Sequence, residues 1–174
     1  MLPSFPALHP MTSALRRTVI LIVSLAACLF TTAAARLDRR IVDTAEAGNP
    51  TSEAEHGYAG DDVSVGMQGG KPYRQTRAWM HYALKTFEDT PVTVACTFVN
   101  TDNSARSYDI VVEDSVIASR TFTPHSNTPA VVEIAVPFSL TKGKAHVAVV
   151  IRARGGQTPA LHLIRTIQDH YEFQ

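Results

Sequence analysis

The sequence has no excess of charge of either sign. Its 16 basic and 16 acidic residues give a formal net charge of +0 at pH 7. Proteins that bind nucleic acid through its phosphates carry clustered positive charge. The composition therefore gives no electrostatic reason to expect a nucleic-acid partner.

Cysteine is scarce, because the chain contains only Cys28 and Cys96. If the N-terminal segment that holds Cys28 is removed, no pair remains to form an internal disulfide. Cys96 alternates with valines in "VTVACTFV", which predicts an inward-facing position on a strand. A reactive thiolate needs a polar, partly exposed setting. We therefore expect Cys96 to be a buried structural residue.

No apolar run is long enough for a permanent membrane span. The run from Val19 to Phe30 is shorter than the roughly 20 residues that a spanning helix needs. It follows two arginines and precedes small residues that offer an A-x-A cleavage site, which is the layout of a secretory signal. We expect residues 1–35 to be a signal peptide, with Met11 as an alternative start, and the mature protein to be periplasmic or extracellular.

A second route of export stays open at Cys28. The letters "LAAC", residues 25–28, resemble a bacterial lipobox, in which the cysteine is lipidated and becomes the mature N-terminus. The apolar run continues past Cys28 and the A-x-A site follows it, so cleavage after Ala35 is the preferred prediction. Lipid anchoring through Cys28 is the alternative, and either route takes the mature chain out of the cytoplasm.

Sustained helical periodicity is also lacking beyond residue 52. Seven or eight short runs instead alternate apolar and polar residues, with turn residues between them. In "WMHYALKTF", for example, Met80 and Tyr82 alternate with Trp79 and His81. Such a series predicts an all-β fold, an antiparallel β-sandwich of the jelly-roll, galactose-binding-like kind with about seven or eight strands. We expect this domain over residues 52–167.

Two polar segments flank the predicted sandwich. Residues 36–51 show no lasting periodicity and are interpreted as a linker, and residues 168–174 as a C-terminal tail. Within the sandwich, "SYDIVVEDSVIAS" predicts a hairpin with its turn at Asp114–Ser115. Alternation places Arg106 on the face opposite to Asp109, so these charges do not form one cluster.

Catalytic and metal-binding patterns are missing as well. The seven histidines are scattered without the spacing of a metal site, and neither a nucleophile elbow nor a phosphate-binding glycine loop is present. Several acidic residues exist, but nothing in the sequence brings two together across a cleft as a glycosidase requires. We expect no catalytic residues, no metal and no cofactor.

Carbohydrate binding requires less, namely an exposed aromatic ring and a few planar polar side chains. Residues of these types lie in or beside the predicted loops. The candidates are Tyr73, Arg74, Trp79, His81, Asp102, Asn103 and Arg106.

Four stretches also carry a family resemblance, in order along the chain: "SEAEH", "YRQTRAWMHYALKT", "CTFVNTDNSARSYDIVVEDSVIAS" and "FSLTKGKAHVAVVIRA". From about Ser52 to Arg165 the sequence resembles the C-terminal β-sandwich accessory domain of bacterial β-L-arabinofuranosidases of glycoside hydrolase families 127 and 146. One departure is Phe98-Val99-Asn100, where that domain tends to have Tyr-Trp-Gly, so one exposed ring is lost.

The resemblance implies a non-catalytic substrate-binding domain, here as a stand-alone protein. Its ligand would be an arabinose-containing glycan, or it would serve a separately encoded glycosidase. The helical catalytic barrel of those enzymes has no counterpart in 174 residues, so we expect no hydrolase activity. The alternatives are a structural sandwich that docks on a partner glycosidase or other exported protein without binding sugar, and a relic of a truncated enzyme gene.

Overall fold

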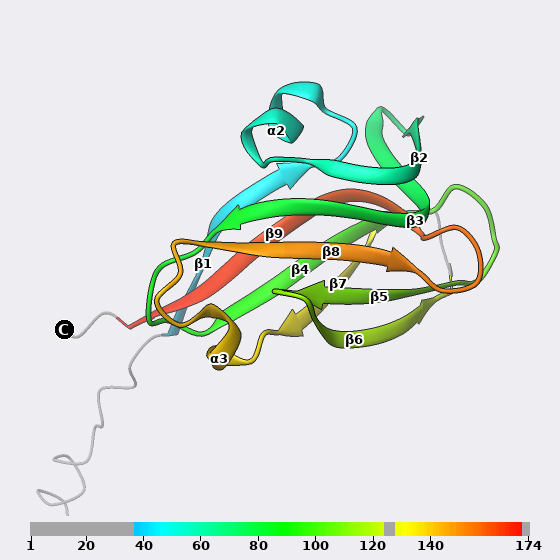
Figure 1. Ribbon diagram of the computed structural model, residues 1–174. Helices are drawn as coiled ribbons and strands as arrows, with labels where there is room; N and C mark the ends of the chain where they lie inside the picture. Colours follow the sequence, from blue (N-terminus) through cyan, green and yellow to red (C-terminus); the bar gives the residue numbers. More distant parts are fainter. Residues whose placement is uncertain (1–36, 124–127, 172–174) are drawn as a thin grey trace, which may run out of the picture. The chain divides into compact units, whose positions relative to one another are not determined.

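The computed structural model describes residues 37–123 and 128–171, and these ranges form a fold that is almost entirely β (Figure 1). The predicted signal peptide and Cys28 lie outside the described residues. No helix in the described part is long and apolar enough to cross a bilayer. The elements are β1 (Leu37–Glu46), α2 (Pro50–Glu55), β2 (Ala59–Gln68), β3 (Lys71–Lys85), β4 (Val92–Val99), β5 (Arg106–Val112), β6 (Ser115–Phe122), β7 (Ala130–Ala135), α3 (Phe138–Thr141), β8 (His146–Ala153) and β9 (Ala160–Tyr171).

The strands pair antiparallel in the order β6-β5-β8-β3-β9-β4-β7, with β2 added to β3 and β1 added to β9. Strands β3 and β9 share a single residue pair, Arg74 with Leu161. The sheet therefore divides into a layer β2-β3-β8-β5-β6 and a layer β1-β9-β4-β7, which face each other (Figure 1). The predicted antiparallel sandwich is confirmed, with nine described strands instead of seven or eight.

The core lies between the two layers, and it is filled by every second side chain along the strands. Met80, Tyr82 and Leu84 on β3 have no exposed surface, as the sequence pattern predicts. Cys96 on β4 is also fully buried, and this burial raises the pKa of its thiol to about 12. A thiol with so high a pKa is a poor nucleophile, so the prediction of a buried, structural Cys96 is confirmed.

The segment expected to be a linker instead contains a strand. β1 pairs with β9 along its whole length, from Leu37 opposite Tyr171 to Glu46 opposite Leu163, and Ala45 is completely buried. A bulge between Ile41 and Asp43 interrupts the alternation, and this interruption hid the strand from a pattern search.

The expected C-terminal tail likewise begins inside a strand. β9 runs on to Tyr171, and Gln168 is only 2% exposed. The Gln168 side chain accepts a hydrogen bond from the Phe87 amide (2.6 Å) and donates to the carbonyls of Phe87 (2.9 Å) and Thr90 (3.0 Å). A polar residue at this position therefore closes the β3–β4 connection, and the sandwich extends to it.

The predicted β5–β6 hairpin is present, but its turn lies one residue earlier than expected. Val112 pairs with Ser115, and the turn residues Glu113 and Asp114 have φ values of 49° and 62°. Two positive φ values in a two-residue loop define a type I′ turn. Glu113 is held at the turn because its carboxylate accepts a hydrogen bond from the Ala148 amide (2.7 Å) and pairs with Lys144.

Candidate functional site

The seven predicted site residues do not come together; the structure places them in three separate regions. Two lie beside α2, two lie on the outer face of the layer β2-β3-β8-β5-β6, and three lie on or next to the β4–β5 loop. In this order, the three groups are Tyr73 and Arg74; Trp79 and His81; and Asp102, Asn103 and Arg106.

Arg74 is bound within the fold. Its Nε and one terminal nitrogen bind the two carboxylate oxygens of Glu53 at 2.8 and 2.7 Å, and its guanidinium lies 4.9 Å from the centre of the Tyr58 ring. The Glu53 side chain is only 7% exposed. Arg74 thus neutralises a buried acid, and its guanidinium is engaged within the fold.

Tyr73 is also occupied. It pairs with Gly66 across the β2–β3 hairpin, and a Cβ added to that glycine would meet the Tyr73 ring at 2.3 Å. The ring therefore covers the backbone of Gly66 at a distance that no other residue type would allow. The position of the Tyr73 ring explains why residue 66 is a glycine. One face of the ring at most is then left for a ligand.

The residues at the β4–β5 loop satisfy one another. Asp102 pairs with Arg106 and accepts a hydrogen bond from the Ser104 amide (3.0 Å). Arg106 also donates to Gln157 (3.3 Å), which in turn donates to Ser64 on β2 (3.1 Å). This polar chain joins two loops to the β2–β3 hairpin.

The hollow next to that polar chain is small. Its cavity volume is about 0 Å³, against the roughly 300–1,000 Å³ of ordinary ligand pockets. Asn103 lies exposed at the tip of the same loop. We conclude that Asp102 and Arg106 chiefly brace the loops.

Trp79 belongs to a continuous line of residues on the outer face. It pairs with Asp61 on β2 and with Arg152 on β8; Arg152 pairs with Asp109 on β5, and Asp109 with Ser119 on β6. Directly opposed residues of neighbouring strands point to the same face of a sheet. We call these five residues the Trp79 row. The indole is 38% exposed, and the Arg152 side chain is 48% exposed.

The charged part of the Trp79 row is held rigidly. Asp109 accepts hydrogen bonds from Ser119 (2.6 Å) and Arg152 (2.9 Å), and Arg154 lies 3.6 Å away. Burial of Asp109 opposes its ionisation, but the hydrogen bonds from Ser119 and Arg152, with the nearby charge of Arg154, lower the pKa of Asp109 overall. The row therefore presents an exposed ring beside the half-exposed guanidinium of Arg152, which the ionised Asp109, itself only 7% exposed, holds in place.

His81 lies two residues beyond Trp79 on the same face. Its Nδ1 is 3.2 Å from the carbonyl oxygen of Gly57, and its strand neighbours are Ala59 and Val150. The imidazole is thus tied to the α2–β2 connection next to the Trp79 row.

Sequence reasoning found Trp79 but missed its partners. Arg152 lies on the outward phase of "HVAVVIRA", and Asp109 on the outward phase of "SYDIVVE", so both could be recognised as outward-facing. Nothing local indicates that β8 lies between β3 and β5, and only this order brings Trp79, Arg152 and Asp109 into one line.

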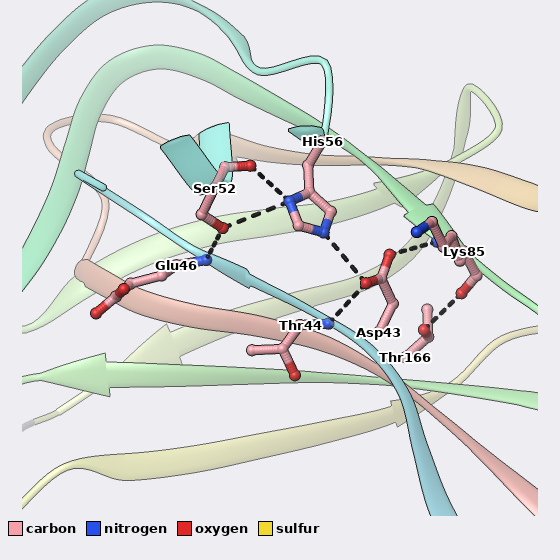
Figure 2. Close-up of polar contacts among 7 residues, drawn as sticks. All are labelled: Asp43, Thr44, Glu46, Ser52, His56, Lys85 and Thr166. Atoms are coloured by element: carbon pink, nitrogen blue, oxygen red, sulfur yellow. Dashed lines mark hydrogen bonds and ion pairs between the residues drawn. The ribbon is translucent and has the colours of Figure 1, made fainter. Parts of the chain in front are cut away.

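A serine, a histidine and an aspartate also meet beside α2, as Figure 2 shows. His56 Nε2 lies 3.2 Å from an oxygen of Asp43, and Nδ1 lies 3.4 Å from Ser52 Oγ and 2.6 Å from the Ser52 carbonyl oxygen. The imidazole is 6% exposed.

These contacts differ from those of a catalytic triad. A general base needs a free ring nitrogen facing the serine hydroxyl, whereas His56 Nδ1 is engaged by the shorter contact to the Ser52 carbonyl. Ser52 Oγ also accepts a hydrogen bond from the Glu46 amide (2.9 Å). The other oxygen of Asp43 accepts a hydrogen bond from the Lys85 amide (2.7 Å) (Figure 2). We call Asp43, Ser52 and His56 the α2 clamp, because they fasten α2 and β1 to the end of β3.

A cavity of about 300 Å³ lies between the edge strands β6 and β7, with Tyr108, Arg120, Phe122 and Val132 among its lining residues. Within residues 37–123 and 128–171, no group of three or more histidine, cysteine or acidic side chains is arranged to hold a metal ion.

The same fold occurs in solved carbohydrate-binding modules. A family 35 module from an environmental isolate aligns with a TM-score of 0.57 and 19% identity over 75% of this chain and 98% of its own. A family 35 module from Cellvibrio japonicus aligns with a TM-score of 0.51 and 12% identity over 74% of this chain and 92% of its own. A family 36 module solved with calcium and xylotriose aligns with a TM-score of 0.50 and 13% identity over 71% of this chain and 98% of its own.

By its fold, the protein is thus a β-sandwich similar to the one in these modules. The chain belongs to a family of unknown function, DUF6805, whose model matches residues 36–167. No curated protein matches its sequence.

Proposed function

We propose that this protein is a non-catalytic carbohydrate-binding domain and that the Trp79 row is its binding face. The observation that carries the proposal is the exposed indole of Trp79 directly beside the fixed Arg152–Asp109 pair. An aromatic ring stacks on the apolar face of a sugar, and planar charged groups form directional hydrogen bonds with its hydroxyls. Both requirements are met within three adjacent strands.

The fold and the sequence resemblance both support this function. The protein shares its sandwich with carbohydrate-binding modules, and its sequence resembles the substrate-binding domain of β-L-arabinofuranosidases. We therefore propose an arabinose-containing glycan as the ligand and an exported, periplasmic or extracellular site of action. An open face with few contacts is expected to bind in the micromolar to millimolar range, about −8 to −4 kcal/mol.

Calorimetric titration after a glycan-array screen tests the proposal. We expect arabinose-containing oligosaccharides to bind the parent protein, and Trp79→Ala to weaken binding at least about tenfold, or about 1.4 kcal/mol. Phe87→Ala is the matched control, because this ring is 58% exposed but lies outside the Trp79 row, and it should bind as the parent does. Unchanged binding by Trp79→Ala, or no glycan bound at millimolar concentration, would reject the proposal.

A second candidate function is docking on a glycosidase through the other layer. Ile41 on β1 and Val131 on β7 are each 56% exposed, and their pairing with Ile167 and Thr97 places both on the outer face of β1-β9-β4-β7. Ile167 and Leu163 on β9 lie on the same face between them, and apolar side chains gathered on one sheet face favour a protein contact. Val131→Asp should then abolish co-purification with the glycosidase while glycan binding stays unchanged.

A further inference from the structure

We infer that the Trp79 row binds the interior of a linear glycan and that the sugar chain lies across the strands, not along them. This inference rests on the proposed function and adds to it the class of ligand and its direction. The five residues of the row come one each from β2, β3, β8, β5 and β6, which lie side by side in Figure 1.

The length of the row sets the length of the ligand. Neighbouring strands are about 4.8 Å apart, so the four steps from Asp61 to Ser119 span roughly 19 Å. A single sugar on Trp79 would reach the groups on the adjacent strand but not both ends of the row. Several sugar units in a line are needed to contact Asp61, Trp79, Arg152 and Ser119 together.

The residues beside the row indicate the direction. The next row, on the His81 side, is Ala59, His81, Val150, Val111 and Val116. It offers mostly aliphatic side chains, and its histidine is engaged by a backbone carbonyl. A chain running along β3 towards His81 would leave the hydrogen-bonding groups after one sugar. In the opposite direction the polar residues Arg77 and Arg154 follow, but Trp79–Arg152 is the last pair that β3 forms with β8, so the two strands no longer offer one paired surface there. A chain that crosses the strands stays on the hydrogen-bonding groups throughout.

The openness of the row excludes recognition of a chain end. Selection of a terminal sugar requires a pocket that encloses it. Asp61 and Ser119, the two ends of the row, are both exposed and lie on β2 and β6, which each pair with one neighbour only in the described sheet. A glycan can therefore continue past both ends.

The test is a length series of linear arabino-oligosaccharides and xylo-oligosaccharides of one to six units, titrated into the full mature protein. We expect the dissociation constant to fall at least tenfold between one and about four units and then to level off. Chemical blocking of either end of the longest bound oligosaccharide should leave its affinity unchanged. Asp61→Asn should weaken the binding of the longer oligosaccharides and leave the binding of the shortest unchanged. Trp79→Ala should weaken the binding of oligosaccharides of every length.

The outcomes separate this inference from the function beneath it. Equal affinity for one and six units, or loss of binding when one end is blocked, would overturn binding to a chain interior and leave carbohydrate binding intact. If no length of either series binds at millimolar concentration, the proposed function itself fails. Asp114→Asn, in the turn of the β5–β6 hairpin, is the control substitution. It should not alter the affinity for an oligosaccharide of any length.

Discussion

Residues of one chemical type serve opposite purposes in this protein. Arg74 and Arg152 both bind an acidic side chain, but Arg74 neutralises a buried glutamate and Arg152 stays half exposed beside a ring. Paired charges inside a protein mainly avoid the cost of an unpaired charge, whereas exposed guanidinium groups can exchange partners. The surroundings of each arginine therefore decide its role.

Removing Arg74 should destabilise the fold without touching the binding face. Arg74→Ala leaves Glu53 buried without its partner, and we expect a loss of about 3–5 kcal/mol in the free energy of unfolding. Arg77→Ala, an exposed neighbour on the same strand, should change it by less than about 0.5 kcal/mol. Urea titration measures both. Equal stability of the two variants would contradict the assigned role of Arg74.

The α2 clamp should make stability depend on pH. Burial of Asp43 disfavours its charge, but hydrogen bonds from the Lys85 amide and His56 lower its pKa overall. A lowered pKa means that ionised Asp43 stabilises the fold above the unfolded-state value of about 3.9, and that this contribution is lost as the pH falls through the lower folded pKa.

Asp43→Asn is the corresponding variant. We expect it to cost about 1–3 kcal/mol near pH 7, where a buried bonding group is lost, and the difference from the parent protein to shrink below about pH 4. Asp102→Asn removes an acid whose side chain is 44% exposed and should cost about 0–1 kcal/mol. Thermal unfolding between pH 3 and pH 7 compares the variants; a pH-independent difference for Asp43→Asn would count against the clamp.

At the scale of elements, regular alternation was a reliable guide and irregular strands were not. The regular alternation of β5, β8 and residues 79–85 of β3 predicts their inward faces correctly. β1 carries a bulge at Ile41–Asp43 and was interpreted as a linker. The hairpin turn was displaced by one residue, because the contacts that hold Glu113 come from Lys144 and Ala148, more than thirty positions away.

The displaced turn gives a direct test by glycine substitution. Asp114 has φ 62°, so Asp114→Gly removes strain and should stabilise the protein by up to about 1 kcal/mol. Ser115 lies in β6, where Ser115→Gly should destabilise by about 0.5–1 kcal/mol. Chemical unfolding of the two variants should give shifts of opposite sign. The reverse pattern would place the turn at Asp114–Ser115.

At the scale of the whole molecule, sheet order creates the proposed binding face. Trp79, Asp109 and Arg152 are widely separated in sequence and become neighbours because β8 lies between β3 and β5. The same order leaves Asp102 and Arg106 at the loop end, away from this line. The site is therefore a property of the assembled layer and not of any one strand or loop.

Export is a prediction for the whole chain. We expect the protein expressed in a bacterium with its complete N-terminus to appear outside the cytoplasm and to begin at Arg36, because the preceding segment has the layout of a signal peptide. Mass spectrometry of fractionated cells measures both properties. Cys28→Ser should leave processing unchanged. A lipid-modified N-terminus lost in Cys28→Ser would establish the alternative route, and an unprocessed cytoplasmic chain would contradict export.

The sequence by itself determined the fold class, the inward faces of the regular strands, the burial of Cys96 and the outward position of Trp79. These follow from alternation, which is a local property of a pleated strand. Only the tertiary structure decided that Arg74 neutralises Glu53, that β1 completes a layer, and that Arg152 and Asp109 lie beside Trp79. Those facts depend on which strands pair and in what register, and pairing is determined by packing energies summed over residues far apart in the chain.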